Sequence, residues 1–182
     1  QVIQIVAPTV WAWRKGRAKK FAKYYDEILT LFKFEKKYFE KYGLKTTFIG
    51  HPISLINSNL INANNEKKFI AFLFGSRENE INKLYPYFKY IHDYMIVQKI
   101  DKYDLFIPTL PHLKNKILQL TNNWKINILV SDDITKNDIL YNQVFASVTC
   151  SGTASLEISK RMIPQIIIYK LNFITFFLFS FL

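Results

Sequence analysis

The chain has 182 residues, of which 49% are hydrophobic, so it is long enough for one domain with a sizeable core or for two small ones. Its formal net charge of +11 at pH 7 favours an anionic partner, such as nucleic acid, a phosphorylated substrate or an acidic membrane surface. The single cysteine, Cys150, excludes an intrachain disulfide and suits a reducing compartment. The chain begins at Gln1, inside an apparent strand, and we expect a fragment of a longer protein.

The N-terminal part of the chain predicts strands that alternate with helices. Apolar runs predict strands over residues 2–7, 27–31 and 46–49. Helical periodicity predicts helices over residues 17–25 and 34–42, and Gly43 is placed to end the second helix. The apolar face of the first helix is formed by Ala18, Phe21, Ala22 and Tyr25.

Aromatic and basic residues are interleaved between the first strand and the first helix. Trp11 and Trp13 precede Arg14 and Arg17 at a strand-to-helix turn, which is where ligands bind in α/β sheets. This pattern can bind nucleic acid or lie on anionic lipid headgroups, and it also suits a solvated basic helix face. His51, in the Gly-His-Pro turn after the third strand, is either a ligand or acid–base group or an ordinary turn residue.

One stretch, F-I-A-F-L-F-G-S-R-E-N-E at residues 69–80, organises the rest of the chain. Its consecutive apolar residues predict a strand that is buried on both faces, as in a parallel sheet. Gly75 allows a sharp turn, Ser76 is placed to cap the next helix, and Glu80 suits its positive first turn. Arg77 then lies at the mouth of the turn, where its guanidinium can bind a phosphate or a carboxylate. The alternative is an ordinary strand–helix turn with a solvated arginine.

The chain after this stretch continues the alternation. The apolar face of the next helix is formed by Ile81, Leu84, Tyr85, Phe88 and Ile91. Pro86 falls inside that pattern, and we expect it to kink the helix or to start a second one. Further strands are predicted over residues 104–107, 126–130, 144–149 and 165–169, with a helix over residues 113–120. Asp132 and Asp133 either hold a cation or are helix caps or surface charges.

A second stretch, C-S-G-T-A-S-L-E at residues 150–157, repeats the design of buried strand, small-residue turn and helix start. Free backbone N–H groups at such a helix start bind phosphate oxygens well. Glu157 lies near the end of the second turn, where a carboxylate can accept hydrogen bonds from a ribose diol. Neither G-x-G-x-x-G nor G-x-x-x-x-G-K-[ST] occurs, and no histidine and cysteine spacing resembles a metal site.

The asparagine-rich segment at residues 53–68 has the composition of a linker between domains. Strands alternate with helices on both sides of it, which predicts an α/β fold with two Rossmann-like halves. The apolar segment at residues 171–182 is shorter than the roughly 20 residues that a membrane-spanning helix needs. We expect it to be a helix that contacts a membrane or faces the core.

Several motifs in one order resemble those of the lipid-A-disaccharide synthase family. They are A-P-T-V-W-A-W-R-K-G-R at residues 7–17, L-F-K-F-E at 31–35, F-I-G-H-P at 48–52, G-S-R-E-N-E-I at 75–81, S-G-T-A-S-L-E at 151–157 and P-Q-I-I-I-Y-K at 164–170. The combination is specific, and it covers nearly the whole chain.

The resemblance implies an inverting glycosyltransferase of the two-Rossmann, or GT-B, architecture in lipid A biosynthesis. Such an enzyme transfers diacylglucosamine from its UDP donor to diacylglucosamine 1-phosphate, which gives lipid A disaccharide phosphate and UDP. The resemblance implies no metal or other cofactor and no nucleic-acid partner, and a homo-oligomer is compatible with it. It also implies a peripheral location on the cytoplasmic, anionic face of the inner membrane of a Gram-negative bacterium.

On this resemblance, residues 1–52 are the remaining part of the acceptor-side domain, 53–68 are the linker and 69–182 are a C-terminally truncated donor-nucleotide domain. The expected donor-binding residues are Gly75, Ser76, Arg77, Glu80, Ser151, Gly152, Thr153 and Glu157. Among them, Arg77 should neutralise the charge that develops on the UDP leaving group. The expected acceptor-side or membrane-side residues are Trp11, Trp13, Arg14, Arg17 and His51. No residue matches the general base of the family, so the catalytic residue stays unnamed.

Three other interpretations stay open at this point. In the first, the chain is an inactive remnant of such an enzyme. In the second, it is a sugar-nucleotide epimerase of the same architecture, and in the third it is a basic nucleic-acid-binding module. An epimerase would lack the W-A-W-R motif, and a nucleic-acid-binding module would show a steep salt dependence.

Overall fold

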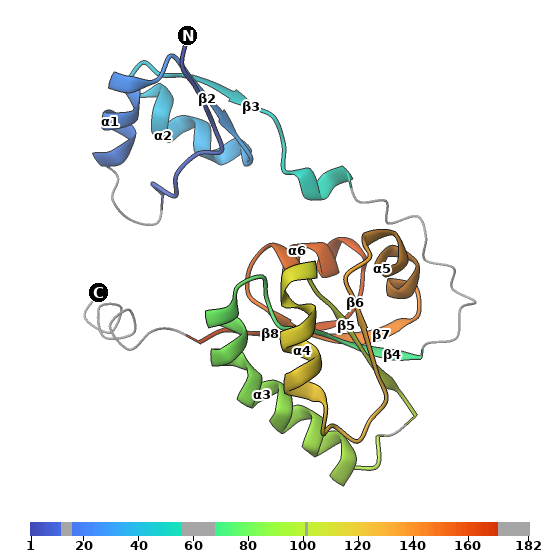
Figure 1. Ribbon diagram of the computed structural model, residues 1–182. Coiled ribbons are helices and arrows are strands. Elements are labelled where there is room, and N and C mark those ends of the chain that lie inside the picture. The colour runs from blue at the N-terminus through green and yellow to red at the C-terminus, as the bar shows by residue number, and fades with distance from the viewer. Residues whose placement is uncertain (12–15, 56–67, 101, 171–182) are drawn as a thin grey trace. The chain divides into compact units, whose positions relative to one another are not determined.

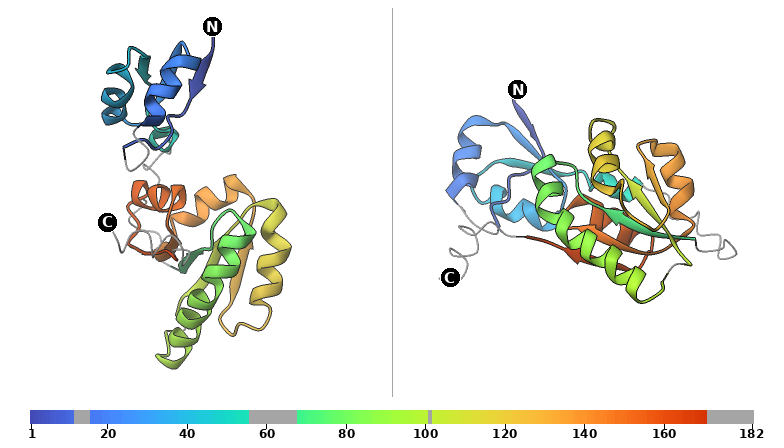
Figure 2. Two further views of the ribbon diagram at one scale, coloured as in Figure 1. Left: turned by 90° about the vertical axis from the view of Figure 1, so that its left-hand side faces the viewer. Right: turned by 60° about the horizontal axis from the view of Figure 1, so that its bottom comes forward.

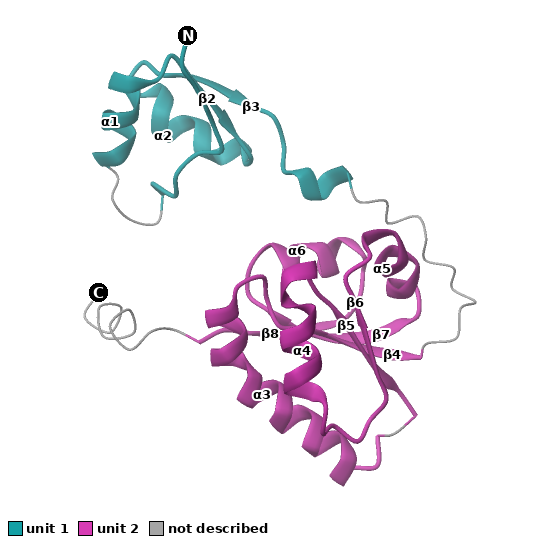
Figure 3. Ribbon diagram, viewed as in Figure 1, with its two compact units in different colours: residues 1–56 teal, residues 57–182 magenta. Residues whose placement is uncertain are grey.

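The computed structural model describes residues 1–11, 16–55, 68–100 and 102–170. The chain divides into two compact units, residues 1–56 and residues 57–182, and each is described by itself (Figure 3). Trp13, Arg14, most of the expected linker and the apolar segment at residues 171–182 lie outside the described residues. Both units confirm the predicted α/β fold built on parallel sheets (Figure 1).

The first unit holds a three-stranded parallel sheet in the order β1-β2-β3. Its elements are β1 (Ile3–Ile5), α1 (Gly16–Tyr24), β2 (Glu27–Thr30), α2 (Lys36–Glu40) and β3 (Lys45–Phe48). Ala18 on α1 and Phe39 on α2 pack with Ile28 of the central strand in one apolar cluster, and Phe21 and Tyr25 lie against its edge. The predicted apolar face of the first helix is therefore the face that packs on the core.

The second helix is shorter than the sequence predicted. Lys33–Glu35 form a 3₁₀ turn before α2 begins, because the Glu35 carboxylate accepts the Phe32 backbone N–H at 3.0 Å and closes that turn. Gly43 ends the helical segment as predicted, with φ at +76°, a conformation that glycine adopts without strain.

A buried carboxylate joins two strands of the first unit. Glu27 on β2 is 7% exposed. Its Oε1 accepts a hydrogen bond from the Thr47 hydroxyl at 2.6 Å, and its Oε2 accepts one from the Lys45 ammonium at 2.9 Å. The Thr47 bond, followed by the Lys45 bond, lowers the pKa of Glu27 because both favour the charged form.

This arrangement makes the stability of the first unit depend on pH. Since the folded-state pKa of Glu27 is lowered, its contribution is present above the ordinary pKa and is lost as pH falls through the folded value. We expect Thr47→Val to raise the pKa of Glu27 and to shift acid unfolding to higher pH. Carboxyl NMR titration and circular dichroism measure both effects. The matched control is Thr135→Val at an exposed site, and equal acid midpoints for both variants would contradict the assignment.

The second unit holds a five-stranded parallel sheet in the order β6-β5-β4-β7-β8. Its strands are β4 (Phe69–Leu73), β5 (Asp104–Pro108), β6 (Ile128–Ser131), β7 (Val144–Cys150) and β8 (Gln165–Ile168). Its helices are α3 (Glu78–Val97), α4 (Lys114–Thr121), α5 (Ile134–Tyr141) and α6 (Thr153–Lys160). Figure 2 shows these helices around the sheet from two further sides.

The central strand β4 is covered on both faces, as the unbroken apolar run predicted. Phe72 and Phe74 point into a core shared with α3 and α4, where the Phe74 ring stacks on Phe88 at 4.0 Å between centroids. Ala71 and Leu73 point the other way, into a core that includes Tyr141 of α5 and Ile158 of α6. Side chains along β4 thus point alternately into two apolar cores, which fixes the register of the sheet.

Pro86 neither starts a second helix nor ends the first one. The helix α3 is continuous from Glu78 to Val97 with Pro86 inside it. Proline removes one backbone donor, at a cost of about 3 kcal/mol. The buried side chains of Leu84 and Phe88, on either side of Pro86, anchor the helix to the sheet and offset that cost.

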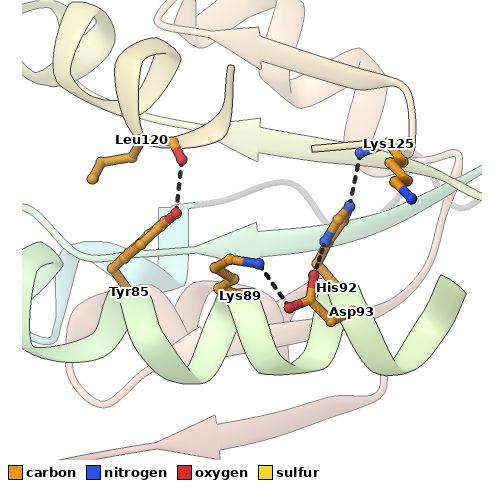
Figure 4. A network of polar contacts seen from close by, with 6 residues as sticks. All are labelled: Tyr85, Lys89, His92, Asp93, Leu120 and Lys125. Carbon is orange, nitrogen blue, oxygen red and sulfur yellow. Dashed lines mark hydrogen bonds and ion pairs between the residues drawn. The ribbon is translucent and has the colours of Figure 1, made fainter. Parts of the chain in front are cut away.

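A polar network joins α3 to the last turn of α4 and to the segment that follows α4 (Figure 4). The Tyr85 hydroxyl donates to the Leu120 carbonyl at 2.9 Å. Nε2 of the buried His92 accepts the Lys125 backbone N–H at 3.1 Å, so Nδ1 carries the proton and donates to Asp93 at 2.9 Å. The Tyr85–Leu120 and His92–Lys125 hydrogen bonds join segments that are distant in sequence, so the network is part of the tertiary core.

In the part of the chain that the structure describes, no helix combines the length and the apolar character needed to cross a bilayer.

Candidate functional site

A cleft opens where the direction of strand addition reverses in the second unit. The chain adds β5 and β6 on one side of β4 and then places β7 and β8 on the other side. The ends of β4 and β7 therefore lie side by side, with Leu73 paired to Thr149. Open α/β sheets bind ligands at this switch point, outside the carboxyl ends of the strands.

The cleft has a volume of about 580 Å³. Both small-residue turns that the sequence singled out contribute to it. Its lining includes all the predicted donor-side residues, namely Gly75, Ser76, Arg77, Glu80, Ser151, Gly152, Thr153 and Glu157. The structure therefore brings these eight residues into one cavity.

The first turn of the cleft requires glycine. Gly75 has φ at +112°, and a Cβ built on it would lie 2.2 Å from Oε2 of Glu80. That oxygen accepts the Ser76 backbone N–H at 3.2 Å. The prediction that Ser76 caps the helix is wrong, because the N-cap of α3 is Arg77 and the Glu80 carboxylate reaches back to the turn instead.

Arg77 is the cation of the cleft that the described residues leave unpaired. Its side chain is exposed, and no carboxylate of the described residues forms an ion pair with it. By contrast, Arg161 pairs with Glu157 and Asp138, two carboxylates that line the cleft. An exposed guanidinium without an internal partner keeps its donors available for a phosphate or a carboxylate.

The second turn supplies backbone donors. Gly152 has φ at +141° and ψ at −154°, which only glycine adopts readily, and it precedes α6. The Ser151 N–H donates to the Ile168 carbonyl, whereas the N–H groups of Gly152, Thr153 and Ala154 have no acceptor among the described residues. Such groups at the start of a helix bind anions.

Other parts of the cleft were not predicted. The cleft is also lined by Pro108, the last residue of β5, by Thr109 and Leu110, which follow it, and by Ile134, Asn137, Asp138 and Tyr141 on α5. The position of Pro108 at the end of a predicted strand was a usable signal, since ends of parallel strands share one edge. No comparable signal marked the α5 residues, since no helix is predicted from the sequence over residues 134–141. Burial raises the pKa of Tyr141, so its hydroxyl stays protonated at neutral pH.

Asp133 follows the helix-cap interpretation of the sequence, and Asp132 follows the surface-charge interpretation. Asp133 is the N-cap of α5, where its carboxylate accepts the Lys136 N–H at 3.0 Å. Asp132 pairs with Lys114 at 2.7 Å, and this hydrogen bond lowers the pKa of Asp132. Within the described ranges, no group of histidine, cysteine and carboxylate side chains is arranged to hold a metal ion.

Three of the predicted acceptor-side residues lie in the described part of the first unit. Trp11 is 44% exposed and meets the Phe34 ring edge-on, with centroids 5.7 Å apart. Arg17 is exposed on α1. His51 serves its own turn, because its Nδ1 accepts the Ile53 N–H at 3.1 Å.

Cys150 lies under the cleft and offers a chemical test of its burial. It is 4% exposed, and burial, followed by the charge of Glu80, raises the pKa of its thiol to about 11. Because the thiolate is the reactive form, we expect a disulfide reagent at pH 7.5 to modify folded protein about 100-fold more slowly than urea-unfolded protein. Absorbance after reagent addition measures both rates. Similar rates would show that the thiol is accessible and ionised in the folded chain.

The two-sided parallel sheet and the cleft at its switch point define a doubly wound α/β protein. The family model described as lipid-A-disaccharide synthetase matches residues 1–182. The chain therefore belongs to the lipid-A-disaccharide synthetase family, which confirms the resemblance of its motifs.

Individual relatives agree with this membership. Lipid-A-disaccharide synthase of Coxiella burnetii (strain RSA 331) is 37% identical over 98% of this chain and 48% of its own length. The enzymes named the same way in Rhodospirillum centenum and Acinetobacter baylyi are 32% and 30% identical, over 94% and 97% of this chain. The chain spans about half the length of these curated relatives.

Proposed function

We propose that the chain is part of a glycosyltransferase of GT-B architecture and that its second unit holds the sugar-nucleotide donor. The reaction would transfer diacylglucosamine from its UDP donor to diacylglucosamine 1-phosphate, with lipid A disaccharide phosphate and UDP as products. One observation carries the proposal: an unpaired arginine and free helix-start N–H groups line a single cleft at the switch point of the sheet. The names of the relatives support the substrate class.

The positions of these residues in the cleft support the following proposed roles. Arg77 neutralises the negative charge that develops on the UDP leaving group when the glycosidic bond breaks. The N–H groups of Gly152 and Thr153 donate to phosphate oxygens. Glu157 accepts hydrogen bonds from the ribose diol. Glu80 contributes from inside the turn, because its carboxylate holds the Ser76 N–H and thereby shapes the loop that presents Arg77.

The proposed acceptor side lies in the first part of the chain. We assign residues 1–52 to the acceptor-side domain, 53–68 to the linker and 69–182 to the donor domain. Exposed Trp11 and Arg17, together with Trp13 and Arg14, would meet the phosphorylated lipid at the anionic, cytoplasmic face of the inner membrane. His51 would support this region through its turn rather than through contact with substrate.

Calorimetric titration of the purified chain with UDP tests the donor site. We expect saturable binding, and we expect uridine, which lacks the diphosphate, to bind at least about tenfold more weakly because charge-assisted hydrogen bonds are absent. ADP serves as the control for base recognition. Absence of saturable UDP binding, or equal binding of UDP and uridine, would contradict the proposal.

A further inference from the structure

A buried arginine braces the wall of the cleft from behind. Arg161 follows the last turn of α6, and its side chain is only 9% exposed. Its guanidinium pairs with Glu157 of α6 and with Asp138 of α5. Its central carbon also lies 4.3 Å from the centroid of the Tyr141 ring. One cation therefore ties two helices that both line the cleft.

The atoms used by Arg161 decide what remains for a ligand. Nε and Nη2 both donate to the same carboxylate oxygen, Oε1 of Glu157, at 3.2 and 3.0 Å. Oε2 of Glu157 has no hydrogen bond to another described residue. Since the Glu157 side chain is 30% exposed and lines the cleft, this oxygen remains available as an acceptor.

The charges around Arg161 also support a role for it in holding Glu157. Asp138 and Glu157 bring two negative charges to the cleft, and Arg161 compensates one of them. Without it, the two carboxylates would repel each other and any phosphate in the cleft, and Glu157 would be free to change its rotamer. The contacts of Arg161 hold Oε1 of the Glu157 carboxylate and leave Oε2 free to accept hydrogen bonds from hydroxyl groups.

We propose that Arg161 is a positioning residue for ribose recognition. It holds Glu157 by one oxygen and leaves the other to accept from the ribose diol, while Asp138 keeps the guanidinium from taking both oxygens. The inference rests on the proposed donor site. A purely structural ion pair would stabilise the fold without changing ligand preference. The proposed role instead requires Arg161 to increase the preference for a nucleotide with a ribose diol over one without it.

Titration with UDP and with 2′,3′-dideoxyuridine diphosphate, which lacks the diol, tests this role. We expect the wild-type chain to prefer UDP by about tenfold or more, the effect of one hydrogen bond to a charged acceptor. In Arg161→Lys this preference should fall below about threefold, because one ammonium cannot replace a fork that holds two carboxylates. Lys160→Gln removes a neighbouring positive charge without touching Glu157 and should keep the full preference.

Two further variants guard against loss of folding in Arg161→Lys. In Asp138→Asn the guanidinium is free to take both oxygens of Glu157, so the preference should also fall, and the 47% exposed side chain makes this a mild change. Adding Arg161→Lys to Glu157→Gln should lower the preference no further than Glu157→Gln alone, since both act through one contact.

The outcomes separate the two proposals. A wild-type chain that does not bind UDP overturns the donor site and the inference with it. A chain that binds UDP but accepts the dideoxy analogue equally well overturns ribose recognition and leaves the phosphate contacts intact. Full preference in folded Arg161→Lys and Asp138→Asn overturns the role of Arg161 alone.

Discussion

Replacing Arg77 by alanine is expected to weaken UDP binding about 10- to 100-fold while the melting temperature stays unchanged. Hydrogen bonds to a charged group contribute about 1.5–3 kcal/mol, which sets the size of the loss. The fold should tolerate the change, because Arg77 is exposed and has no ion pair with a described residue. The backbone of the turn is held by Glu80 and not by the arginine side chain.

Calorimetry with UDP on both proteins measures the change. The matched control is Arg17→Ala, which removes an exposed arginine from α1 of the first unit and should leave UDP affinity within about twofold of wild type. If Arg77→Ala bound UDP as tightly as the unmodified chain, another group would have to carry the phosphate charge. An equal loss in both variants would instead indicate a nonspecific effect of net charge.

Replacing His92 by alanine is expected to lower the free energy of unfolding by about 2–4 kcal/mol. The ring is 2% exposed and stacks on Trp124 with centroids 4.5 Å apart, so its removal leaves a cavity. The Lys125 backbone N–H also loses its acceptor. An unsatisfied buried donor and lost packing therefore add in the same direction.

Urea unfolding monitored by tryptophan fluorescence measures this loss. His112→Ala is the matched control, because His112 is exposed and is not part of the network in Figure 4, and it should change stability by less than about 0.5 kcal/mol. Similar midpoints for the two variants would show that the network around His92 contributes little. UDP affinity should remain measurable in both, since neither histidine lines the cleft.

The sequence predicted the strands of the second unit well, because their signal is local. A short apolar run such as residues 69–74 is typical of a strand that is buried on both faces, and the glycine after it predicts the turn. Gly75 and Gly152 both take positive φ values, and both turns line the cleft. The parallel order of the sheet follows from strands that alternate with helices.

The features that were missed depend on contacts between distant segments. Asp138 and Arg161 meet only because α5 and α6 cover the same face of the sheet, and no local pattern reports that. The cap of α3 was assigned to Ser76 from residue preference, whereas the reach of the Glu80 carboxylate decided the actual arrangement. Pro86 stays inside a helix because the burial of Leu84 and Phe88 on either side of it outweighs the tendency of proline to end a helix.

The order of strands also bears on how the second unit folds. Phe69 on β4 pairs with Val144 on β7, and two strands and three helices lie between them in the chain. Until β7 has been synthesised and docks, β4 is an edge strand with apolar side chains on both faces, which is a surface prone to aggregation. Such nonlocal pairing is slow. The cleft is therefore completed late, and nascent chains that end before β7 should depend on chaperones.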